Sequence, residues 1–181
     1  IHQIREKTEG WVAAMQLAAL SSKASGSNTV SPNSVQLFTG EEKLINDYVL
    51  TEILEQQPEP VQEFLLDSSC LFRLNAELCN AIRETENSQK MLDNLEQANL
   101  FIIPLDTTHH WFRYHDLFRE SLFLRLKLSA PKRVLSLQRK AVDWLLDHDH
   151  YHEATTQLIQ LEDWHWLKQV LEEHGNTLIH Q

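Results

Sequence analysis

Ten histidines, two cysteines and 26 Asp or Glu supply side chains that could hold a metal or catalyse a reaction. Five of the histidines gather at two places, His109 with His110, and His148 with His150 and His152. The second group alternates within an expected inter-helix turn, whereas a zinc-binding helix places its ligands at i and i+4 on one face. We therefore interpret both groups as solvated loop histidines and expect no metal site.

Catalytic and phosphate-binding motifs are missing from the sequence. There is no nucleophile with a base, no carboxylate pair at a recognisable spacing and no G-x-x-x-x-G-K-[ST] loop. Cys70 and Cys79 are too few for a disulfide framework and match no zinc spacing, which favours a reducing, cytoplasmic compartment. The longest apolar run, 11–20, is shorter than the roughly 18–20 residues that cross a bilayer. We expect neither an enzyme nor a membrane partner.

Charge is distributed unevenly along the 181 residues, whose net charge is −10. Between residues 113 and 140, eight Lys or Arg stand against Asp116 and Glu120, which gives +6 and leaves −16 for the rest of the chain. Such a basic strip could meet nucleic acid, a phosphate ligand or an acidic protein, or it could be a solvated helix face. Its basic residues are Arg113, Arg119, Arg125, Lys127, Lys132, Arg133, Arg139 and Lys140.

The elements that must position these residues are mostly helical, because only four Gly and five Pro interrupt the chain. Residues 21–40 are rich in Ser, Asn and Thr and are read as a loop or linker. Asn75 and Ser88 are the expected N-caps of two helices. Apolar positions at three- and four-residue spacing predict helices over 4–20, 41–57, 61–68, 76–83, 88–98, 116–128, 134–145, 154–161 and 164–171.

One small hairpin interrupts this pattern. Residues 100–105 form a compact apolar run, 106–110 are polar and 111–114 are aromatic-rich, which favours strand, turn and strand. Three helices followed by a two-stranded wing and another helix are typical of a winged-helix domain. The helix pairs after it suggest the start of a helical-repeat arm. The fold class is therefore mainly α with one small β-hairpin.

A winged helix can bind DNA through its third helix, so the charge of that helix matters. Residues 83–99 contain two bases and four acids, a net charge of −2. DNA affinity comes largely from neutralising phosphates, so we expect no direct DNA contact by this chain. Two alternatives stay open: a stand-alone helical interaction domain that binds an acidic partner through the 113–140 strip, and a winged-helix nucleic-acid binder if that strip lies on one face.

Five ordered segments carry a family resemblance. They are 98–106 (ANLFIIPLD) with 111–118 (WFRYHDLF), 8–20 (TEGWVAAMQLAAL), 47–54 (DYVLTEIL), 64–71 (FLLDSSCL) and 137–144 (LQRKAVDW). Together they resemble the LuxR-type large ATP-binding transcriptional regulators, the MalT-like branch of the STAND signal-transduction ATPases.

The resemblance implies a domain order of nucleotide-binding domain, helical lid, winged helix, helical arm, sensor superhelix and C-terminal helix-turn-helix. It assigns residues 1–40 to the end of the lid and a linker, 41–128 to the winged helix and 129–181 to the arm. The chain begins with Ile1 inside an expected helix, so we expect an excised fragment.

The implied function is that of the regulatory mid-section of a bacterial ATP-dependent transcription activator, coupling nucleotide state to interdomain arrangement. Its implied partners are its own nucleotide-binding domain and sensor superhelix, with self-association on activation. ADP or ATP with magnesium is expected in the full-length protein, and no cofactor in the fragment.

His115 is the site residue that the resemblance implies. Residues 114–117 stand at the position of the Met-His-Asp motif of related ATPases, whose His contacts the β-phosphate of ADP and holds the resting state closed. The alternative is a His packed at a strand-to-helix junction and bonded only to backbone. Tyr114 is expected to pack inward, and Asp116 to cap the following helix.

A weaker likeness concerns the adenine. Residues 10–12 stand where related ATPases carry Gly-x-Pro against that base, but Val12 replaces the Pro. We interpret Trp11 as a core anchor.

Overall fold

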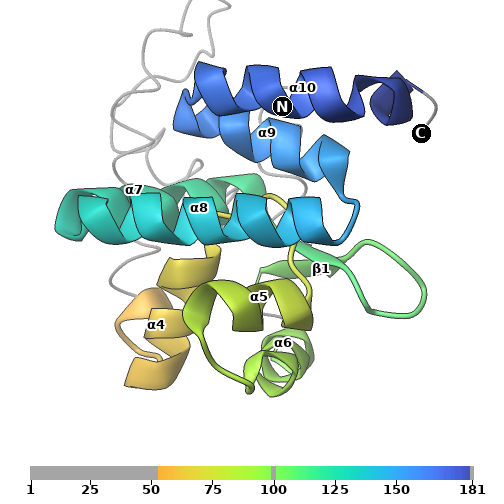
Figure 1. The fold of residues 1–181 in the computed structure, drawn as a ribbon. Coiled ribbons are helices and arrows are strands. Elements are labelled where there is room, and N and C mark those ends of the chain that lie inside the picture. The colour runs from red at the N-terminus through yellow and green to blue at the C-terminus, as the bar shows by residue number, and fades with distance from the viewer. Residues whose placement is uncertain (1–52, 99–100, 180–181) are drawn as a thin grey trace, which may run out of the picture.

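The computed structural model describes residues 53–98 and 101–179, the last four by their backbone alone. The expected helix 4–20, the linker, most of the expected helix 41–57 and the Trp11–Val12 segment lie outside these residues. The described elements confirm the predicted class, mainly α with one hairpin (Figure 1). They are α4 (Glu59–Ser68), α5 (Ala76–Arg83), α6 (Ser88–Gln97), β1 (Ile102–Pro104), β2 (Phe112–Tyr114), α7 (Asp116–Ser129), α8 (Pro131–Asp147), α9 (Tyr151–Leu161) and α10 (Trp164–Ile179).

The helix starts follow local hydrogen bonding. The Asn75 side chain accepts a 2.7 Å hydrogen bond from the Leu78 N–H, which confirms the predicted N-cap of α5. The predicted Ser88 cap is wrong by one residue, because Asn87 precedes α6 and Ser88 is its first helical residue. The Ser88 N–H instead donates to Asn80 Oδ1 at 3.0 Å, so a side chain from α5 serves the start of α6.

The predicted wing is a short antiparallel pair. Ile102 lies opposite Tyr114, and Pro104 lies opposite Phe112. Leu74, in the segment between α4 and α5, exchanges two backbone hydrogen bonds with Phe112, at 2.7 and 2.8 Å. The wing is thereby joined to the helical part of the domain through its backbone as well as through side chains.

Asp106 organises the wing loop. Its carboxylate accepts hydrogen bonds from the backbone N–H groups of Thr108, His110 and Trp111, and from the Thr108 hydroxyl. These donors favour the charged form and lower the pKa of Asp106 well below its ordinary value. A single side chain thus fixes the loop that carries two of the histidines noted in the sequence.

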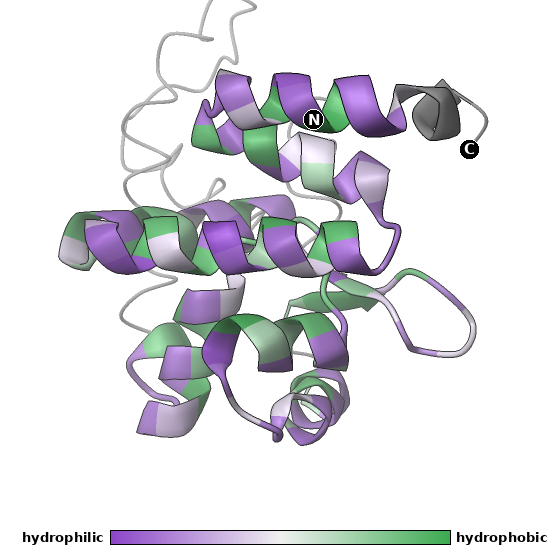
Figure 2. Cartoon of the chain, in the orientation of Figure 1, coloured by the Kyte–Doolittle hydropathy of each residue, from purple (hydrophilic) through white to green (hydrophobic). Residues whose placement is uncertain are grey.

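One hydrophobic core runs from the winged helix into the arm. Side chains of α4 to α7 and of the wing share a buried cluster with residues of α8 and α9, which include Leu137, Ala141, Leu145 and Ala154. α8 packs against α5 on one side and α9 on another, and it carries both hydrophilic and hydrophobic bands (Figure 2). A second cluster of Val142, Leu158 and Val170 attaches α10. The boundary between 128 and 129 stays a prediction, but the described residues on its two sides fold around shared apolar contacts.

Candidate functional site

His115 lies at the junction between β2 and α7. Its backbone N–H donates to the Phe101 carbonyl at 2.9 Å, and its carbonyl accepts from the Arg119 N–H at 2.9 Å. The residue is half-buried and occupies the N-cap position of α7 with an extended backbone. The strand-end, helix-start placement expected for this residue is therefore present, and its backbone is held from both sides.

Tyr114 fixes the strand just before His115. As predicted it packs inward: it is 1% exposed and lies edge-on to Phe118. Its hydroxyl lies 2.8 Å from Ser68 Oγ, and Ser68 Oγ also donates to the Phe64 carbonyl, so the tyrosine is the donor in the pair. Burial raises the pKa of Tyr114 far above its ordinary value and keeps it a neutral donor.

Asp116 does not cap α7 as expected. It is the first helical residue, its side chain is exposed, and its carboxylate lies 3.8 Å from Arg113 Nη1. The chain turns one residue earlier than predicted, so His115 takes the N-cap position. No side-chain hydrogen bond closes this helix start, and its first N–H groups are suited to an anion.

Arg119, one turn into α7, adds a positive charge near this helix start. Its guanidinium lies 4.6 Å from the centre of the Phe72 ring. Nη1 is buried and has no hydrogen-bond partner among the described residues. Burial lowers the pKa of Arg119, which nevertheless stays cationic at neutral pH.

Asp67 is a buried charge that the sequence analysis missed. Its side chain is 3% exposed, and Arg133 of α8 donates to both of its oxygens, Nε to Oδ1 at 2.7 Å and Nη2 to Oδ2 at 2.8 Å. Arg83 Nε of α5 lies 3.5 Å from Oδ2. The carboxylate of α4 therefore ties two helices of the winged helix to the first helix of the arm. An acidic residue among the apolar positions of α4 was the only local signal.

Part of the basic strip forms ion pairs with acidic residues of the winged helix. Arg133 binds Asp67, and Lys140 lies 2.8 Å from Glu84. Arg113 of β2 and Arg119 of α7 are partly buried. Arg125, Lys127, Lys132 and Arg139 are exposed. The charge excess read from the sequence thus divides into cations that hold the arm and cations that face solvent.

The histidines of the two sequence groups contact different side chains. His109 pairs with Glu96 of α6. His148 and His150 both stack on the Trp144 ring, and His150 also meets Trp111 of the wing edge-on. In the described part of the chain, no group of three or more His, Cys, Asp or Glu has a metal-binding arrangement. Cys70 and Cys79 are free, buried thiols, and burial raises the pKa of Cys79 to about 12.

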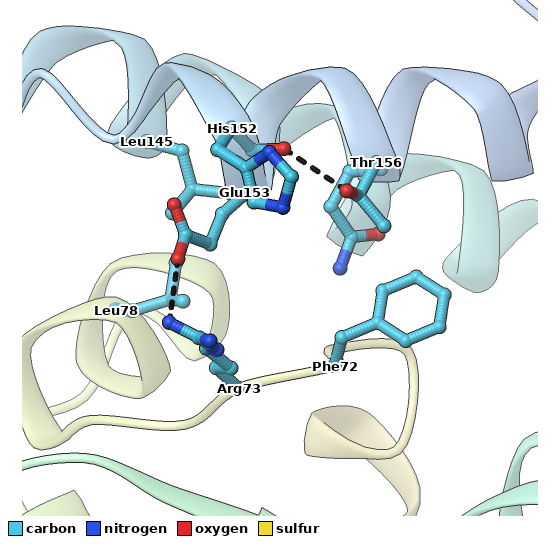
Figure 3. Close-up of a pocket in the computed structure, with 8 residues that line it drawn as sticks. Phe72, Arg73, Leu78, Leu145, His152, Glu153 and Thr156 are labelled. Carbon is cyan, nitrogen blue, oxygen red and sulfur yellow. Dashed lines mark hydrogen bonds and ion pairs between the residues drawn. The ribbon is translucent and has the colours of Figure 1, made fainter. Parts of the chain in front are cut away.

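A cavity of about 170 Å³ lies where the segment after α4 meets α8 and α9. Phe72, Leu78 and Leu145 give it apolar walls, and Arg73 pairs with Glu153 across it at 2.9 Å (Figure 3). Sequence reasoning did not find it, because its walls come from segments about 80 residues apart.

Taken together, the fold and the His115 junction define a winged-helix domain continued by packed arm helices. Residues 50–134 match the model of the MalT winged helix domain. This part of the chain is a MalT winged helix domain, and homology to MalT regulators and to PknK extends over most of the chain.

The relatives are considerably longer than this chain. It is 28% identical over 180 residues to the HTH-type transcriptional regulator MalT of Vibrio parahaemolyticus, covering 99% of the chain and 20% of that protein. It is 30% identical over 176 residues to MalT of Yersinia pestis, covering 97% and 19%. It is 29% identical over 163 residues to the serine/threonine-protein kinase PknK of Mycobacterium tuberculosis, covering 90% and 14%. The chain thus spans a fifth or less of these relatives.

No catalytic domain is evident in residues 53–98 and 101–179. Among the helices described, none is both long and apolar enough to cross a bilayer.

Proposed function

We propose that this chain is the regulatory mid-section of a bacterial ATP-dependent LuxR-type transcription activator. In this proposal the winged helix reports the nucleotide state and the arm transmits it to the other domains. Its partners are the protein's own nucleotide-binding domain and sensor superhelix, and the activated protein self-associates in the cytoplasm. The fragment itself neither binds nor hydrolyses ATP and makes no direct DNA contact.

The observation that carries the proposal is the shared packing of the winged helix with helices α8 and α9. A shared core joins α5, α8 and α9, and the Arg133 guanidinium binds the buried Asp67 carboxylate of α4. Packed interiors are close to incompressible, so a displacement at one end of such a body is passed to the other. A domain built to read DNA would not need this fusion to an arm.

His115 is the proposed contact to the nucleotide. An imidazole at an uncapped helix start, on a backbone fixed by Phe101 and Arg119, suits an anionic oxygen of ADP. Bound ADP would supply the negative β-phosphate, and His115 would hold it. The closed arrangement would then depend on a contact that the ATP-bound, induced state does not use.

The relatives support a role that does not depend on whether the full-length protein is a transcriptional regulator or a kinase. Homologous segments occur in proteins named as a transcriptional regulator and as a protein kinase. What such proteins have in common is regulation, so a module shared between them fits a coupling role better than it fits one chemistry or one DNA site.

The test is an interdomain distance in the full-length protein. One label is placed at exposed Arg139 on α8 and the other in the nucleotide-binding domain. We expect the distance to differ between ADP and ATP with inducer in the wild type. The His115→Ala variant in ADP should shift toward the ATP-state distance. The proposal would be contradicted if the wild-type distance were the same with ADP as with ATP and inducer.

The alternative function, nucleic-acid binding by the winged helix, is tested by a separate experiment. α6 carries Lys90 against Asp93 and Glu96, so its face offers little to phosphates. A mobility-shift assay on the 181-residue chain at physiological salt should give no sequence-specific complex. A sequence-dependent shift that is lost in Lys90→Ala would favour the nucleic-acid binder instead.

A further inference from the structure

The cavity between the winged helix and the arm has an unusual distribution of charge. Phe72, Leu78 and Leu145 form apolar walls, while Arg73 and Glu153 approach from opposite sides and meet at 2.9 Å (Figure 3). The two charged residues come from the segment after α4 and from the first turn of α9. One cation and one anion thus face each other over an apolar space.

The charged pair is accessible and exchangeable. The Arg73 side chain is 54% exposed and that of Glu153 is 20% exposed. Ion pairs with this much solvent contact contribute little net stability, because water and counter-ions compensate each charge. A ligand that carries both charges can therefore break the Arg73–Glu153 ion pair at a small cost in free energy. It would then form one ion pair with Arg73 and another with Glu153.

The floor of the cavity adds a polar group. Gln157 is 2% exposed, and its Nε2 donates to the Cys70 carbonyl at 3.2 Å. Its Oε1 accepts no hydrogen bond from any described residue. A buried acceptor without a donor is unfavourable, so a ligand that brings an N–H donor to Gln157 would be favoured at this site.

The size restricts the ligand. A volume of about 170 Å³ corresponds to roughly five or six water molecules at about 30 Å³ each. That is room for a compact molecule of about nine heavy atoms.

We propose that this cavity binds a small zwitterion, a free α-amino acid with an apolar side chain. Its carboxylate pairs with Arg73, its ammonium pairs with Glu153, and its side chain lies among Phe72, Leu78 and Leu145. This site is separate from the proposed nucleotide contact at His115. Because its walls belong to both the winged helix and the arm, the bound amino acid stabilises their joint by mass action.

The test uses the 181-residue chain with L-leucine as the probe. At about ten times the dissociation constant, a single site should raise the melting temperature by about 3–6 °C. N-acetyl-L-leucine amide, which has the same side chain and no charge, should give no rise. Calorimetric titration should give one site per chain.

Three variants distinguish binding of L-leucine at this site from a general effect of L-leucine on the stability of the fold. Glu153→Gln and Arg73→Gln should fold and lose the L-leucine response. The matched control Lys168→Gln removes an exposed ion pair to Glu172 on α10, 3.6 Å in length, and should keep it. The proposal is overturned by any of three results: no melting shift with apolar L-amino acids up to about 10 mM, an equal shift with the uncharged amide, or unchanged binding by Glu153→Gln and Arg73→Gln.

Discussion

Arg133 binds Asp67 through two parallel hydrogen bonds, 2.7 Å from Nε to Oδ1 and 2.8 Å from Nη2 to Oδ2, across 66 residues of sequence. The fork-to-fork geometry joins the first helix of the arm to the buried face of α4. Because the carboxylate is almost fully covered, the pair also sets the orientation in which α8 packs against the winged helix.

Removing the carboxylate should be the most disruptive single change at this joint. Asp67→Ala leaves Arg83, whose side chain is 7% exposed, without its anion, and losing one partner of a buried pair costs about 3–5 kcal/mol. Arg133→Ala should cost less, about 1.5–3 kcal/mol, because Arg83 stays beside Asp67. Urea denaturation measures both. Lys140→Ala, which breaks the exposed pair with Glu84, is the control and should change the free energy of unfolding little.

Ser68 and Tyr114 should respond unequally to removal of their hydroxyls. Tyr114→Phe leaves Ser68 with the Phe64 carbonyl as its acceptor and should cost about 0.5–1.5 kcal/mol. Ser68→Ala leaves the buried Tyr114 hydroxyl without its hydrogen-bond acceptor. This substitution should lower the free energy of unfolding by about 1–3 kcal/mol. The free energies of unfolding of the two variants check this order. The reverse order would mean that the tyrosine finds another acceptor.

The hydrogen bonds that hold the wing loop to the Asp106 carboxylate should be lost at acidic pH. Donors from Thr108, His110 and Trp111 lower the pKa of Asp106 below the ordinary 3.8. A depressed carboxylate contributes stability above its unfolded pKa and loses it as the pH falls through the folded pKa. The amide signals of these three residues should therefore keep their native shifts down to about pH 4 and move only well below the ordinary pKa of 3.8. In Asp106→Asn they should already be shifted at neutral pH. Native shifts in that variant would show that the loop holds without the carboxylate.

Local periodicity predicted the elements well, because each depends on neighbours in sequence. The Asn75 cap, the inward Tyr114 and the hairpin were all readable from short windows. Ser88 and Asp116 were each assigned a capping role one residue too late, since the choice of cap was settled by Asn80 and by the turn at His115. Such choices depend on contacts that a local pattern does not contain.

The joint and the cavity could not be predicted in the same way. Asp67 and Arg133 are 66 residues apart, and Arg73 and Glu153 are 80 apart. Their pairing is a consequence of how α8 and α9 pack on the winged helix. The sequence did show an excess of basic residues over 113–140, but it did not show which of them are turned inward.

The proposed function depends on His115 holding the β-phosphate of ADP in the full-length protein. If the histidine holds this phosphate, His115→Ala removes a charge-assisted contact of about 1.5–3 kcal/mol, which is roughly a 10- to 150-fold loss of ADP affinity. ATP affinity and melting temperature should hardly change, and basal transcription should rise without inducer, because the closed state alone is weakened. His109→Ala, on the wing loop, is the matched control and should leave ADP binding unchanged.

The decisive measurement is the ADP dissociation constant of full-length wild type and His115→Ala, taken beside their melting temperatures. We expect His115→Ala to bind ADP more weakly than the wild type at an unchanged melting temperature. Unchanged ADP binding with a lowered melting temperature would contradict this proposal and make His115 a residue that only packs between β2 and α7.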